Sequence, residues 1–102
     1  MIAFAAIMVL AAAAMQASAA PRHQFVTCLK QSVEKARADK VTPEGFGAFA
    51  RQSCATQIGS FKQGLVSFDL KNGVARKRAE ADAELQIEDY LVVSSENLDP
   101  GS

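Results

Sequence analysis

The sequence predicts an all-α protein, a small three-helix arrangement built on an antiparallel helical hairpin that one disulfide staples. Cys28 and Cys54, the only cysteines, each lie 13 residues from Val41. The adjacent Thr42-Pro43-Glu44 is typical of a helix start. If two helices meet near Val41, both sulfur atoms lie about 20 Å from the turn and face each other. A pair of unbonded, buried thiols is the alternative.

Residues 1–19 are predicted to be a signal peptide. Met1 to Met15 are apolar, and Ala17-Ser18-Ala19 supplies the small residues of a cleavage site. We expect cleavage after Ala19, because cleavage after Ala20 would leave Pro21 as the first residue. No lysine or arginine precedes the apolar run, which is unusual for a signal peptide. An uncleaved membrane anchor is the alternative, and we expect membrane contact only in that case.

We predict one helical domain for residues 20–95 and a frayed tail for residues 96–102. The first helix is expected from about Gln24 to Lys40, and a second helix follows a Thr42 cap. Apolar residues of the second helix recur at spacings of 4, 3, 4 and 3, namely Cys54, Ile58, Phe61, Leu65 and Phe68. Gly59 and Gly64 predict either a kink between them or close packing of a neighbouring helix.

Residues 66–71 alternate between apolar and polar, and the Asn72-Gly73 that follows is also typical of a β-hairpin turn. No second strand follows, because Val74 leads directly into a basic triplet. We therefore interpret Asn72-Gly73 as a helix end, with a local strand as the alternative. The third helix is expected from about Val74 to Ser95, with an apolar residue at every fourth position, namely Ala75, Ala79, Ala83, Ile87 and Leu91.

Charge is divided unevenly along the chain. All 11 lysine and arginine residues lie between Ala20 and Arg78, whereas seven of the 11 acidic residues lie between Ala79 and Ser102. The third helix begins with the basic residues Arg76-Lys77-Arg78 and carries acidic residues towards its end. This order is the reverse of the one that the helix macrodipole favours. We favour internal pairing, with Lys62 opposite the acidic residues of the third helix, over a surface that faces a partner. The candidate partner surface comprises Arg76, Lys77, Arg78, Glu80, Asp82, Glu84 and Glu88.

The sequence contains no recognisable catalytic or cofactor motif, so we expect no enzyme activity and no cofactor. Glu80, Glu84 and Glu88 share a helix face, but no facing histidine completes a metal site. The only histidine, His23, would be a third-position ligand for Cu(II) or Ni(II) only after cleavage behind Ala20. The basic triplet 76–78 lacks interleaved aromatic residues, so we expect no nucleic-acid partner.

These observations predict a small exported protein, periplasmic or secreted, that acts as a binding or structural module in the cell envelope. Its partner would be an unidentified protein or a second copy of the chain. The alternative is a periplasmic carrier of a small apolar ligand or a metal ion. A carrier requires a concave pocket, for which the candidate lining residues are Phe46, Phe49, Phe61 and Tyr90.

Overall fold

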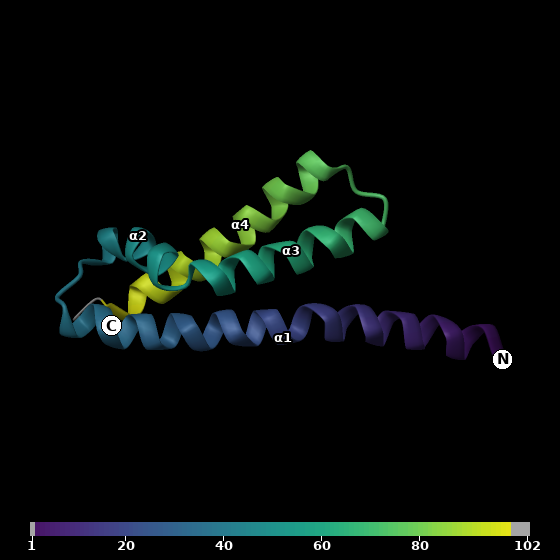
Figure 1. Ribbon diagram of the computed structural model, residues 1–102, viewed down its shortest axis with the longest axis horizontal. Helices are drawn as coiled ribbons and strands as arrows, with labels where there is room; N and C mark the ends of the chain where they lie inside the picture. Colours follow the sequence, from purple (N-terminus) through teal and green to yellow (C-terminus); the bar gives the residue numbers. More distant parts are fainter. Residues whose placement is uncertain (1, 99–102) are drawn as a thin grey trace.

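The computed structural model describes the backbone of residues 2–98 and the side chains of residues 19–98. The described residues form helices without any β-strand, which confirms the predicted all-α class and the disulfide-stapled hairpin. Figure 1 shows the elements, which are α1 (Ile2–Ala38), α2 (Pro43–Ser53), α3 (Ala55–Lys71), α4 (Arg76–Ser95) and the 3₁₀ turn η1 (Glu96–Leu98).

The first helix, α1, begins much earlier than the sequence predicts. It starts at Ile2, so the predicted leader and the first helix of the domain are continuous, with Pro21 inside the helix. In Figure 1 the N-terminal part of α1 extends beyond the other helices. The predicted leader, residues 1–19, lies almost wholly outside the described side chains and stays a prediction. Within the described residues, no helix has a stretch long and apolar enough to cross a membrane.

The turn between α1 and α2 is fixed by backbone hydrogen bonds and by a side-chain cap. Lys40 adopts the left-handed conformation (φ 58°), and the Val41 N–H donates to the carbonyl of Ala36 at 2.9 Å. This is the helix-ending geometry of a Schellman motif. Thr42 then caps α2, because its Oγ1 accepts from the Gly45 N–H at 3.1 Å. The predicted helix start is therefore confirmed.

The second predicted helix is divided in two at Cys54. Ser53, the last residue of α2, donates its hydroxyl to the Phe49 carbonyl at 2.9 Å. Serine side chains that bond the preceding turn in this way often bend helices. The break therefore lies before the predicted kink, and α3 continues through Gly59 and Gly64 without interruption. The second of the three predicted helices therefore corresponds to two helices, α2 and α3, with a hinge at Cys54 between them.

The turn between α3 and α4 follows the helix interpretation of Asn72-Gly73. Asn72 donates its side-chain N–H to the carbonyl of Phe68 at 2.8 Å, and Gly73 has a positive φ of 84°. Residues 66–71 belong to α3, so the strand alternative is wrong. The following helix, α4, begins at Arg76. Its N-cap residue is Ala75, so the helix start has no side-chain hydrogen bond from its cap.

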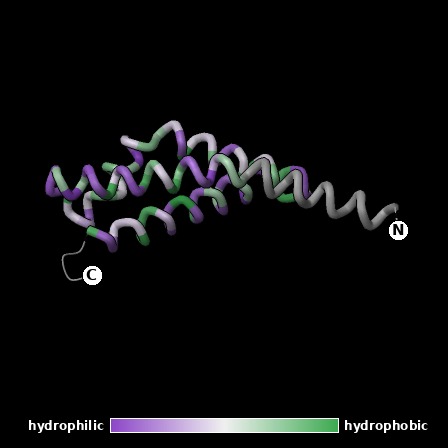
Figure 2. Tube along the Cα trace, turned by 90° about the horizontal axis from the view of Figure 1, so that it is seen from below, coloured by the Kyte–Doolittle hydropathy of each residue, from purple (hydrophilic) through white to green (hydrophobic). Residues whose placement is uncertain are grey.

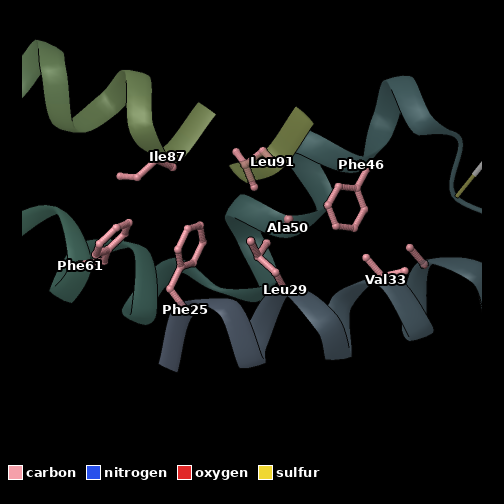
Figure 3. Packing of buried hydrophobic residues seen from close by; sticks show 9 residues of the cluster. Phe25, Leu29, Val33, Phe46, Ala50, Phe61, Ile87 and Leu91 are labelled. Atoms are coloured by element: carbon pink, nitrogen blue, oxygen red, sulfur yellow. The ribbon is translucent and has the colours of Figure 1, made fainter. Parts of the chain in front are cut away.

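The main core lies where all four helices meet. Phe25 of α1, Phe46 of α2 and Phe61 of α3 are fully buried. In Figure 3, Phe25 and Phe61 lie near Ile87 of α4, whereas Phe46 lies farther along the core, near Val33. Hydrophobic and hydrophilic residues alternate along each described helix, as expected for amphipathic helices with one buried face (Figure 2). A smaller cluster continues along α3 and α4 beyond the main core and contains Val66, Ala79 and Ala83.

The helices do not contact one another equally. α3 packs extensively against both α1 and α4, and α2 also contacts both, whereas α1 and α4 contact each other much less. One side of the core, between α1 and α4, is therefore left thinly covered. The turn η1 follows α4, and its Leu98 packs against the core. Residues 96–98, expected as part of a frayed tail, are thus ordered, while residues 99–102 lie outside the described residues.

Candidate binding groove and the charged cluster

A groove of about 570 Å³ lies between α1 and α4. It follows from the packing described above, because α2 and α3 close one side of the core and leave the opposite side to two helices. Along α1 the groove extends from Val26 to Arg37, a distance of about 16 Å at the helical rise. Its main apolar lining residues are Val26, Leu29, Val33, Tyr90 and Val93.

The floor of the groove is connected to the aromatic core. Tyr90 makes edge-to-face contacts with Phe25 and Phe61, at ring-centroid distances of 5.5 and 5.9 Å. Phe25 and Phe61 stack at 5.4 Å. Tyr90 therefore connects the lining of the groove to the packed aromatic core.

The rim of the groove carries polar side chains of both signs. The Arg37 guanidinium lies 3.1 Å from the Glu34 carboxylate and donates to the Asn97 carbonyl at 2.8 Å, which ties η1 to α1. Lys30 also lines the groove and has no ion-pair partner among the described residues. Val93 lines the groove with 60% of its surface exposed. The groove therefore combines an apolar floor with one uncompensated positive charge.

The aromatic residues that the sequence suggests as the lining of a ligand pocket mostly lie in the core instead. Phe46 and Phe61 are fully buried, and Phe49 packs against the same core. Of the four aromatic residues proposed, only Tyr90 lines the groove. Helical spacing identified which residues face inward, but it did not separate those that fill the core from the residue at its open side.

The charged cluster joins α2, α3 and α4 on another side of the molecule. Arg51 lies 2.6 Å from a Glu84 carboxylate oxygen and 2.8 Å from a Glu88 oxygen. Lys62 of α3 lies 3.4 Å from the other oxygen of Glu84. Hydrogen bonding from Arg51 lowers the pKa of Glu84 below its ordinary value, and Coulombic attraction acts in the same direction. The hydrogen bond to Glu88 raises the pKa of Arg51.

The remaining residues of the candidate partner surface form local pairs at the beginning of α4. Arg76 lies 3.9 Å from Glu80, and Arg78 lies 3.7 Å from Asp82, each one turn further along the helix. These pairs place a carboxylate beside basic residues that lie at the unfavourable, positive end of the helix macrodipole. Lys77 is exposed and has no ion-pair partner among the described residues. A role of this surface in binding a partner stays a prediction.

The disulfide lies between α1 and the hinge. Cys28 and Cys54 are bonded, with their Cα atoms 6.0 Å apart. Cys54 is fully buried, whereas Cys28 is partly exposed. Ser32 is 4% exposed, and its hydroxyl lies 3.2 Å from the Cys54 sulfur. Since a disulfide sulfur has no proton, the serine is the donor.

His23 lies exposed on α1 and lines a small depression that Cys28 also lines. The described residues contain no group of three or more histidine, cysteine or acidic side chains that could hold a metal ion. The proposed terminal Cu(II) or Ni(II) site depends on where the leader is cleaved and stays a prediction.

Comparison of the chain with models of protein families, with curated proteins and with solved structures found no match.

Proposed function

We propose that this protein is a small exported binding module of the cell envelope, and that the groove between α1 and α4 is its binding face. The observation that carries the proposal is an apolar groove left open beside a rigid core. The disulfide supports export, because such bonds persist mainly in oxidising compartments. All groove-lining residues follow the predicted cleavage site, so removal of the leader leaves the groove intact.

The occupant that the groove fits best is an amphipathic helix of a partner protein. A groove of about 16 Å accommodates three turns of helix, which present apolar anchors at positions i, i+3 or i+4, and i+7. The unpaired Lys30 on the rim complements a carboxylate at the edge of the partner helix.

The alternative function, a carrier of a small apolar ligand, is favoured by the volume of the groove. About 570 Å³ lies within the range of roughly 300–1,000 Å³ typical of small-molecule sites. However, such sites bury most of the ligand surface. A ligand in this groove would contact only α1, α4 and η1, and would keep one side exposed to water. A helix with its own polar face meets this geometry better.

Site-specific photo-crosslinking in the native envelope tests the proposal. A photoreactive residue replaces Val93 in the groove, and in a matched variant it replaces Leu85, which is on the same helix and similarly exposed (60% and 64%). Leu85 does not line the groove. We expect a protein adduct at Val93 that is absent at Leu85, and the crosslinked peptide of the partner should carry apolar residues at helical spacing.

The other outcomes contradict the helix proposal and identify its replacement. An adduct of a few hundred daltons at Val93 would mean that the groove carries a small ligand. An adduct with a second copy of the chain would assign the groove to self-association. Equal adducts at Val93 and Leu85 would show that the groove has no special role in binding.

A further inference from the structure

The core of the described residues contains one buried polar side chain, Ser32, and its hydroxyl points at the sulfur of Cys54. Burial of a hydroxyl costs free energy unless a good hydrogen-bond acceptor compensates it. A disulfide sulfur is a weak acceptor, whereas a thiolate is a strong one. Ser32 is therefore better satisfied when Cys54 carries a negative charge than in the bonded state.

The two sulfur atoms are not equally accessible. Cys54 is fully buried, but Cys28 lines an open depression on the surface of about 320 Å³. The depression is lined by residues with amide, hydroxyl or imidazole groups, namely Gln24, Thr27, Gln31, Gln57 and His23. Amide and hydroxyl groups of this kind can donate hydrogen bonds to peptide groups and accept them as well. An incoming thiol can therefore reach only one of the two sulfurs.

We propose that Cys28 is a thiol-exchange site, at which a peptide-like thiol such as glutathione forms a mixed disulfide. The attacking thiolate forms a new S–S bond to the Cys28 sulfur, and the Cys28–Cys54 bond breaks. Its electron pair leaves on the Cys54 sulfur, which becomes a thiolate that accepts the hydrogen bond of Ser32. The exchange is neutral in redox terms, because one disulfide replaces another and one thiolate replaces another.

The position of Cys54 gives the exchange a structural consequence. Cys54 lies between the C-terminus of α2 and the N-terminus of α3. The partial negative charge of the first helix end and the partial positive charge of the second therefore largely cancel at its sulfur. The Ser32 hydroxyl is then the main group that stabilises the leaving thiolate. Among the described residues, breaking the bond leaves the hinge connected to α1 only by packing and by the hydrogen bond between Ser32 and Cys54.

Mass spectrometry of the folded, oxidised protein with millimolar glutathione tests the site. The reaction is quenched with acid, free thiols are alkylated and the protein is digested. We expect glutathione on Cys28 and the alkyl group on Cys54. The opposite assignment, equal labelling of both positions, or the absence of any adduct would overturn the proposal. This mapping uses the unsubstituted protein, so it does not depend on whether a variant folds.

Substitution then tests the part played by the hydroxyl. Ser32→Ala should slow adduct formation about fivefold, since it removes one hydrogen bond to a developing charge. Ser95→Ala is the matched control, because that hydroxyl also bonds to a carbonyl of the preceding turn, that of Val92 on α4, and should change the rate by less than about twofold. Equal rates in the two variants would contradict the role of Ser32. 2-Mercaptoethanol should react more slowly than glutathione when the two rates are compared at matched thiolate concentration and corrected for the higher pKa, and so the higher nucleophilicity, of the 2-mercaptoethanol thiol. Equal corrected rates would contradict recognition of a peptide-like thiol.

Discussion

Arg51 and Glu84 form an ion pair of 2.6 Å between α2 and α4. The pair lies just before the hinge at Cys54, so it holds α2 against α4 at the point where the chain changes direction. Glu88 and Lys62 enlarge the pair into a cluster of four residues from three helices. Two acidic residues of α4, Glu84 and Glu88, thus pair with basic residues of α2 and α3.

Replacement of Glu84 should make stability less dependent on pH. The pKa of Glu84 is lowered in the folded protein, so its contribution is present above the ordinary value of 4.5 and is lost as pH falls through the folded pKa. We expect Glu84→Gln to lower the free energy of unfolding by about 0.5–1 kcal/mol at pH 7, because the pair is partly exposed, and by much less at pH 3. Urea unfolding at both pH values measures this.

Asp89→Asn is the control for that experiment, since Asp89 is exposed on the same helix and has no ion-pair partner among the described residues. The loss of unfolding free energy in Glu84→Gln should also be smaller in 1 M salt, because salt screens ion pairs that are partly exposed to solvent. A loss that is the same at pH 7 and pH 3 would contradict the assignment of the cluster.

Loss of the disulfide should destabilise the fold without abolishing its helices. Double substitution of Cys28 and Cys54 by alanine should lower the free energy of unfolding by about 3.5 kcal/mol on the chain-entropy estimate for this loop. The aromatic core remains, so circular dichroism should still show a helical protein. A variant as stable as the original protein would mean that the bond does not constrain the unfolded chain as expected.

Phe61 and Phe68 on α3 provide a matched test of the core. Phe61 is fully buried between Phe25 and Tyr90, whereas Phe68 is 44% exposed. Phe61→Ala should lower the free energy of unfolding by about 3–5 kcal/mol, and Phe68→Ala by less than about half of that. Thermal or urea unfolding compares the two. Similar losses would contradict the position of α3 against α1.

The sequence predicted the helical class, the disulfide and both turns, because each depends on local signals or on simple helical geometry. It did not predict the hinge at Cys54, since the apolar spacing continues unbroken through that residue. On either side of the break, α2 and α3 each contact both α1 and α4. Ser53 was the available local signal, since its hydroxyl bonds to the preceding turn.

The groove was less predictable than the fold. Val26, Val33 and Val93 look like ordinary core positions in the sequence, and only the unequal packing of α1 and α4 leaves them at an open side. Lys30 was likewise one basic residue among several. Its lack of a partner becomes informative only when the pairing of Arg37 with Glu34 is known.

The leader makes a separate prediction about the mature terminus. Intact mass of protein purified from its native envelope should correspond to a chain that begins at Ala20. A chain that begins at Pro21 would instead restore His23 as a metal-ligand candidate. An intact leader would favour the membrane-anchor alternative, in which the groove would be held close to the bilayer.

The central claim is that the groove binds a partner helix, and the affinity of two matched variants tests it most directly. The partner peptide found by crosslinking at Val93 is titrated against Val93→Asp and Leu85→Asp, which place the same charge on the same helix at similarly exposed positions. We predict that Val93→Asp weakens binding at least about tenfold, because a carboxylate would be buried against the apolar floor. Leu85→Asp should change the dissociation constant by less than about twofold. Equal effects of the two substitutions would contradict the assignment of the groove as the binding face.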